Sequence, residues 1–266
     1  MALLQLVRPT ARGGRPSTVT CFGGGGAFGI AFNLGVARAL QDGGMALEDG
    51  PMLGTSAGSW TAAALATGLT LEDLVPTWER PAARGPRRVI DSSGAVWGDR
   101  RHARVIGVAL QLPLGRRRLL SGAEHPIADV VAASSSLPGF AASHVIDGRR
   151  YVDGGLLSPA SADRAPAGDV LVVTAPMAGP LLGTVGRLID QRTRWETAHW
   201  TLRHGRPVLY VHPDQRFRSE LGRLGDVMAM RGIDEVHRKA YDLGCESLEA
   251  FRSRSRQWAG WAAWAS

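Results

Sequence analysis

The chain has 266 residues, of which 44% are hydrophobic and 21% are charged, and its formal net charge is +7. A chain of this length and apolar content can bury a substantial core, so the composition excludes a disordered protein. No apolar run reaches the ~18 residues that a membrane span needs, which excludes a spanning architecture. The apolar start of the chain is too short for a secretory signal, and we expect a cytoplasmic protein.

The positive charge comes almost wholly from arginine, since Lys239 is the only lysine. The arginines are spread along the chain, whereas nucleic-acid binding favours concentrated charge. The two cysteines, Cys21 and Cys245, cannot form a disulfide framework, and no Cys/His spacing resembles a metal site. We therefore expect no metal, no cofactor and no nucleic-acid partner.

Three regions follow from the pattern: a flexible arm over residues 1–16, a core over 17–180, and a mostly helical extension over 181–266 that packs on the same domain. A β-branched run predicts a strand over Ser17–Phe22, and four glycines interrupt it. Apolar residues at helical spacing follow over Phe28–Leu40. A brief strand over Pro51–Leu53 and a helix over Ala57–Ala66 complete a βαβ unit with a further helix, which predicts an α/β fold with parallel strands.

The remaining elements are predicted in the same way. In chain order, they are a helix from Thr70 to about Trp78, a loop over Pro81–Arg101, strands over Val105–Leu112 and Arg118–Leu120, a helix over Pro126–Ala133, a hairpin over Val145–Val152 turned at Asp147–Gly148, a strand over Asp169–Thr174, a helical stretch over Leu182–Leu202, a strand over Val208–Val211, and helices to the end.

Ser56 lies in a G-x-S-x-G motif that follows a predicted strand and opens a predicted helix. This context is typical of a nucleophile elbow, in which a strained serine projects from the edge of the sheet. The flanking positions crowd the backbone, so only glycine fits at Gly54 and Gly58. The alternative is a glycine-flanked serine that caps the helix.

The glycine loop Gly23–Gly26 follows the preceding strand. Strands joined by a right-handed crossover are parallel, so the loops after both strands emerge at the same edge of the sheet. Gly24, Gly25 and Gly26 can therefore turn backbone N–H groups toward an oxyanion near Ser56. The same run also fits the dinucleotide fingerprint, with Glu48 or Asp49 about 20 residues further on, but the expected second strand is poor there.

Asp153 ends the predicted strand Arg149–Val152 and precedes two glycines, so a carboxylate is presented on a loop. An activated serine needs such a proton acceptor. Without the other motifs, Asp153 is better explained as a second turn of the same kind as Asp147-Gly148.

Together, Gly24–Gly29, Gly54–Gly58 and Asp153-Gly154-Gly155 resemble the three motifs of the patatin-like phospholipase family. The segment Ala133–Phe140 resembles the one that precedes the family's aspartate strand. The resemblance implies a three-layer α/β/α sandwich with a mostly parallel central sheet, and a Ser-Asp dyad with Ser56 as nucleophile, Asp153 as its activator and the glycine loop as oxyanion hole. One departure is Phe28, where the family usually has Arg or Lys.

In this reading the protein is a serine lipid acyl hydrolase that forms an acyl-enzyme on Ser56. Aspartate is a weaker base than histidine, so burial should raise the pKa of Asp153, with Tyr151, Leu156 or Leu157 as an apolar wall. Two alternatives stay open. One is an α/β-hydrolase esterase whose base is His199, His204 or His212, and the other is a non-catalytic lipid-binding module.

The C-terminus carries Trp258, Trp261 and Trp264 at helical spacing, after Arg252, Arg254 and Arg256. Such a stripe is typical of a helix that contacts a membrane surface. It is equally typical of a terminal helix that packs its tryptophans on the domain or on a partner.

Overall fold

The computed structural model of the protein describes residues 17–79, 87–221 and 232–255. The arm expected over 1–16 and the three C-terminal tryptophans lie outside the described residues. In the described part of the chain, no helix is both long and apolar enough to cross a bilayer.

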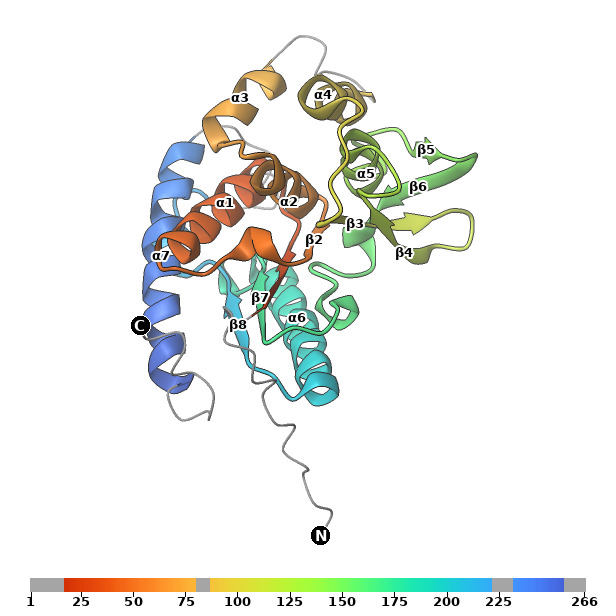
Figure 1. The fold of residues 1–266 in the computed structure, drawn as a ribbon. Helices are drawn as coiled ribbons and strands as arrows, with labels where there is room; N and C mark the ends of the chain where they lie inside the picture. The colour runs from red at the N-terminus through yellow and green to blue at the C-terminus, as the bar shows by residue number, and fades with distance from the viewer. Residues whose placement is uncertain (1–16, 80–86, 222–231, 256–266) are drawn as a thin grey trace.

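The strands form one mixed sheet, and the longest continuous part of it is parallel (Figure 1). Parallel pairing joins β3, β2, β1, β7 and β8 in that order, while β4, β5 and β6 are antiparallel additions at the β3 end. The strands are β1 (Thr18–Phe22), β2 (Met52–Thr55), β3 (Val105–Gln111), β4 (Arg116–Ser121), β5 (His144–Ile146), β6 (Arg149–Asp153), β7 (Val170–Thr174) and β8 (Val208–Val211).

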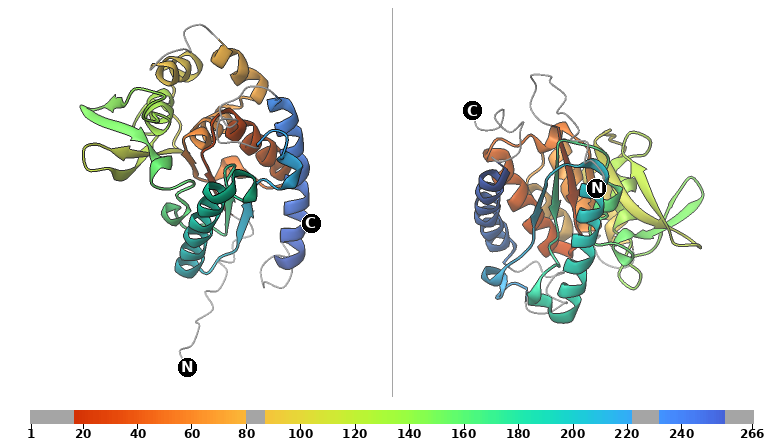
Figure 2. Two further views of the ribbon diagram at one scale, coloured as in Figure 1. Left: turned by 180° about the vertical axis from the view of Figure 1, so that it is seen from behind. Right: turned by 90° about the horizontal axis from the view of Figure 1, so that it is seen from below.

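Helices cover both faces of this sheet, so the three-layer α/β/α architecture expected from the resemblance is confirmed (Figures 1 and 2). One face is covered by α1, α2, α5 and α7, and the other by α6 and the segment around Ala162. The helices are α1 (Gly26–Asp42), α2 (Ala57–Thr67), α3 (Leu71–Glu79), α4 (Arg88–Trp97), α5 (Ile127–Ser134), α6 (Gly183–His204) and α7 (Ile233–Ser255).

The strands are buried on both faces because their side chains alternate between two apolar cores. On β7, Val170 and Val172 join the core under α1, whereas Leu171 and Val173 join the core under α6. A strand with apolar residues at every position is what a doubly covered parallel sheet requires. The continuous apolar runs of the sequence therefore marked these strands correctly.

Strand β3 brings two distant parts of the chain together. β4 occupies one edge of β3 over Ile106–Gln111, so β2 and β6 must share the other edge. β2 ends where Thr55 lies opposite Val108, and β6, which runs the other way, ends where Asp153 lies opposite Ala109. The C-terminal ends of β2 and β6 therefore point at each other across a single residue step of β3.

The loop predicted over Pro81–Arg101 is partly wrong, because helix α4 lies within it. Apolar packing accounts for this helix: Trp97 is buried, its ring lies 5.2 Å from that of Trp60, and its indole N–H donates to Thr67 Oγ1 at 3.1 Å. Tertiary contacts thus override a local sequence rich in Ser, Gly and Arg.

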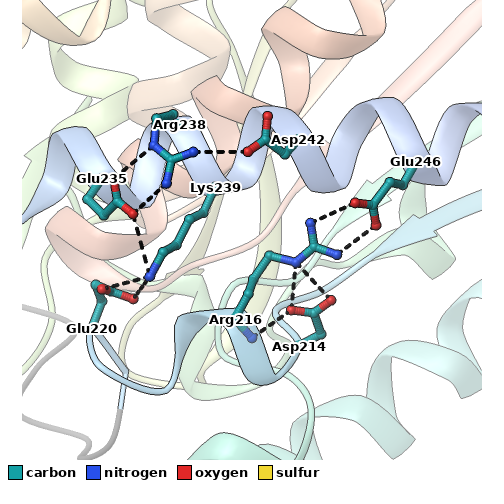
Figure 3. Close-up of polar contacts among 8 residues, drawn as sticks. All are labelled: Asp214, Arg216, Glu220, Glu235, Arg238, Lys239, Asp242 and Glu246. Atoms are coloured by element: carbon teal, nitrogen blue, oxygen red, sulfur yellow. Dashed lines mark hydrogen bonds and ion pairs between the residues drawn. The ribbon is translucent and has the colours of Figure 1, made fainter.

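Helix α7 packs along α1 and is tied to the segment after β8 by ion pairs (Figure 3). Arg216 bridges Asp214 and Glu246, the latter with its two terminal nitrogens at 3.0 and 2.6 Å. Lys239 meets Glu220 at 3.0 Å and Glu235 at 3.7 Å. This network fixes the C-terminal helix on the body of the domain.

Candidate active site

Ser56 lies between the last residue of β2 and the first residue of α2. Its backbone has φ 54° and ψ −121°, a conformation that is rare for a residue with a side chain. The residue is half-buried, which leaves part of it accessible. It makes no side-chain capping bond to α2, so the interpretation of Ser56 as a helix cap is not supported.

The turn around Ser56 is so tight that two glycines are required. A Cβ on Gly54 would lie 2.4 Å from the backbone of Gly58, and a Cβ on Gly58 would lie 1.8 Å from the carbonyl oxygen of Phe22. Both distances are far below any real contact, and the obstructing atoms are backbone. Helix α2 can therefore approach β1 and β2 this closely only with hydrogen at these positions.

Gly58→Ala is expected to lower the free energy of unfolding by roughly 3 kcal/mol or more, because α2 must move away from β1. Urea unfolding measures the effect. Gly94→Ala is a matched control, since a Cβ on this α4 glycine meets nothing within 4 Å, and alanine in a helix should stabilise by about 0.5–1 kcal/mol. Equal stability of the two variants would contradict the close approach.

The glycine loop lies against Ser56, as the parallel pairing of β1 and β2 predicts. A Cβ on Gly24 would be 3.3 Å from Ser56 Cβ and 4.0 Å from Ser56 Oγ. The N–H of Gly24 is already used, because it donates to the carbonyl of Pro159 at 3.1 Å. Within residues 17–79, 87–221 and 232–255, the structure gives no acceptor for the N–H groups of Gly25 and Gly26, at φ 150° and 56°.

A buried asparagine that the sequence analysis did not single out holds this loop. Asn33 Nδ2 donates to the carbonyl of Gly23 at 3.0 Å, and its Oδ1 accepts from Thr174 Oγ1 at 2.7 Å. The Gly23 N–H in turn donates to the carbonyl of Thr174 at 2.9 Å. An asparagine among positions of α1 that are otherwise apolar was the signal that could have pointed to it.

Asp153 is the last residue of β6 and is only 3% exposed. Its Oδ1 accepts the N–H of Gly155 at 2.7 Å, which caps a short 3-10 helix over Gly154–Leu156. Asp153 is thus a turn-capping residue, as the alternative interpretation predicts, and its carboxyl also lies near enough to the Ser56 hydroxyl for that hydroxyl to lower the pKa of the carboxyl. The structure brings together the serine, the carboxylate and the glycine loop.

Burial raises the pKa of Asp153 to about 6, while the hydrogen bonds from Ser56 and from the Gly155 N–H act in the opposite direction. The surroundings differ in part from the apolar wall that we expected. Tyr151 is buried, but Leu156 and Leu157 are 55% and 50% exposed and so face outward. Val108 packs against the next residue of the turn, since a Cβ on Gly154 would be 3.1 Å from Val108 Cγ1.

Among the described residues, none of the three histidines considered as bases makes a hydrogen bond or ion pair with Ser56 or Asp153. His199 and His204 lie on α6, where their rings contact Trp195 and Trp200. His212 follows β8 and contacts the Pro213 carbonyl at 3.0 Å. β8 is three strands away from β2, a separation of roughly 14 Å at the usual strand spacing.

The second strand that a dinucleotide-binding site requires is also not formed. Leu47–Asp49 form a 3-10 helix instead of a strand that ends in an acidic residue. The Glu48 carboxylate accepts from Gln41 at 2.8 Å, on the flank of α1. The acid is therefore not presented as ribose binding requires.

Phe28, which stands where a basic residue is usual, is a core residue. Its ring is 6.1 Å from that of Phe32 and 6.0 Å from that of Phe217, and it is 1% exposed. The packing of the three rings holds α1 against the segment after β8. Phe28 therefore cannot supply the positive charge that an Arg or Lys side chain would carry at this position.

Comparisons with known proteins match the segment that carries the third of the three motifs. The model of the family described as Patatin-like phospholipase matches residues 113–166, a segment that includes Asp153. Among solved structures, the crystal structure of VipD from Legionella pneumophila aligns with 90% of this chain and 67% of its own, with a TM-score of 0.47 and 11% identity. No curated protein sequence matches the chain significantly. At the level of the family, the matching segment supports lipid acyl hydrolysis.

Proposed function

We propose that the protein is a serine lipid acyl hydrolase with a Ser56–Asp153 dyad, and the match of residues 113–166 to the model of the patatin-like phospholipase family supports this proposal. The observation that carries the proposal is the meeting of β2 and β6 on one edge of β3, which sets a strained serine beside a buried carboxylate of raised pKa. Strained residues and perturbed pKa values concentrate at functional sites.

In the proposed reaction, Asp153 accepts the hydroxyl proton as Ser56 Oγ attacks the ester carbonyl. The negative charge that develops on the carbonyl oxygen is stabilised by the N–H groups of Gly25 and Gly26, aided by the positive end of α1. Asp153 then gives its proton to the leaving alcohol, and an acyl-enzyme remains on Ser56. A water molecule, deprotonated by Asp153, releases the fatty acid and restores the serine.

The proposed substrate is a fatty acyl ester, of the phospholipase A, lysophospholipase or carboxylesterase type. Leu156 and Leu157 follow Asp153 after two glycines and are half-exposed, which supports binding of an apolar acyl chain on this side of the dyad. The absence of a cation at Phe28 favours esters whose turnover does not depend on a bound charge at that place. We also propose that the C-terminal tryptophans contact a membrane. These residues lie outside the described part of the chain.

A fluorophosphonate probe tests the function directly, because it reacts with an activated serine and not with an ordinary one. We expect stoichiometric labelling of the full-length protein, with the adduct on Ser56 in the peptide mass spectrum. Ser56→Ala should remain unlabelled. An intact protein that binds lipid vesicles but takes up no probe would support the lipid-binding module instead.

The pH dependence of hydrolysis should report Asp153. The carboxyl must be ionised to accept the serine proton, so kcat/KM should rise with pH through about 6 and fall about tenfold per pH unit below it. Initial rates on a short neutral acyl ester between pH 4 and 8 measure this. A midpoint at the ordinary aspartate value would show that the carboxyl is not desolvated.

A further inference from the structure

One turn of the chain contacts the backbone of both proposed dyad residues. This turn, Ser134–Ser136, ends α5 and lies in the segment whose sequence resembles the patatin-like family. The Ser56 N–H donates to the Ser134 carbonyl at 3.1 Å and to Ser134 Oγ at 3.0 Å. The Asp153 N–H donates to the Ser136 carbonyl at 3.0 Å.

The Ser134 hydroxyl also lies at the point where the pairing of β3 changes from β2 to β6. It lies within hydrogen-bond distance of the carbonyls of Val108, at 2.8 Å, and of Gly54, at 3.2 Å. Val108 is the last β3 residue opposite β2, and the next residue already faces β6. One buried hydroxyl, 0% exposed as part of Ser134, therefore connects β2, β3 and the N–H of Ser56 where the strand ladder is interrupted.

These hydrogen bonds explain how Ser56 keeps its strained backbone conformation. A residue with φ 54° keeps that conformation only when its surroundings fix it. Here the peptide N–H of the strained residue is held by two oxygens of Ser134, and Ser134 itself is fixed because Val130 and Ser134 pack over Gly107 of β3. The side chain of Ser56 is thereby directed without any contact between Ser134 and the reacting atoms.

We propose that Ser134 is a positioning residue for the nucleophile, whose hydroxyl holds the Ser56 backbone in its strained conformation. The inference rests on the function proposed above and deepens it. Within the described residues, Ser134 makes no hydrogen bond to the Ser56 hydroxyl or to the Asp153 carboxyl, so removal of its hydroxyl should slow the chemical step and leave substrate binding unchanged.

The test compares Ser134→Ala with Ser93→Ala. Ser93 is an equally buried serine, on α4, whose hydroxyl also bonds a backbone carbonyl, that of Ile90 at 3.1 Å. Both variants are assayed at least ~15 °C below their melting temperatures, so that both are fully folded. We expect kcat and the rate of fluorophosphonate labelling at Ser56 to fall roughly 10- to 100-fold in Ser134→Ala, with KM within about twofold. Ser93→Ala should keep both rates within about twofold.

The outcomes separate the two proposals. If the wild-type protein is not labelled at Ser56, the proposed function fails. If the wild type is labelled and Ser134→Ala reacts at the wild-type rate, or if both variants lose rate in proportion to their loss of stability, the positioning role is overturned. The acidic midpoint of the Ser134→Ala rate profile should stay at the wild-type value, since Asp153 keeps its burial, whereas general loosening of the site would lower that midpoint.

Discussion

The Ser56→Ala variant is expected to lose hydrolysis of fatty acyl esters, with a fall in kcat/KM of about 10³-fold or more. No acyl-enzyme can form without the hydroxyl, and only binding and the glycine-loop donors remain to assist attack by water. The measurement is a panel of acyl esters, assayed with wild type and variant purified in parallel. Undiminished turnover by Ser56→Ala on every ester of the panel would refute the nucleophile assignment.

A second substitution at the same position separates chemistry from folding. Ser56→Gly removes the hydroxyl as well, but glycine adopts φ 54° without the steric penalty, which is about 1–3 kcal/mol for other residues. We therefore expect Ser56→Gly to be inactive and yet more stable than Ser56→Ala by about 1 kcal/mol in urea unfolding. Equal stability would indicate that the strain is already relieved in another way.

The elements that position the site could be predicted because each has a local signature. β1 is a run rich in β-branched residues, and β2 and β7 are short, mostly apolar runs. The two glycine motifs follow β1 and β2, and a parallel crossover brings both loops to one edge of the sheet. What periodicity could not supply is the end-to-end arrangement of β2 and β6 on β3. That arrangement depends on the pairing of both strands with β3, although β2 and β6 themselves lie about a hundred residues apart in the chain, and only the family resemblance indicated that their ends meet.

The parts that escaped prediction are held by tertiary contacts. Helix α4 has a poor local sequence and owes its place to Trp97 and to its packing on α5. Asn33 and Ser134 are polar residues inside the core, which sequence patterns assign equally well to loops or caps. The role of each residue depends on which carbonyl or N–H group it bonds. These partners are known only when the fold has brought distant strands together.

Asp153→Asn is expected to reduce kcat/KM about 10³-fold, because an amide cannot accept the serine proton at any pH. Asp147→Asn is the matched control, an exposed turn residue of the same hairpin at φ 48°, a conformation that asparagine tolerates well. It should hydrolyse esters at the wild-type rate. Wild-type activity in Asp153→Asn would mean that another group activates the serine, and the histidines would have to be reconsidered.

The same substitution should stabilise the fold above pH 6. The pKa of Asp153 rises from 3.8 to about 6 on folding, so the folded protein holds the proton more tightly than the unfolded chain. Stability from this group is therefore complete below pH ~4 and is lost as the pH rises through 6, a loss of roughly 3 kcal/mol at most. Urea unfolding at pH 4.5 and pH 8 should show Asp153→Asn gaining about 1–3 kcal/mol over wild type at the higher pH and clearly less at the lower. A gain that does not change with pH would show that the carboxylate carries no desolvation cost, and the site would then lack the feature that makes an aspartate a usable base.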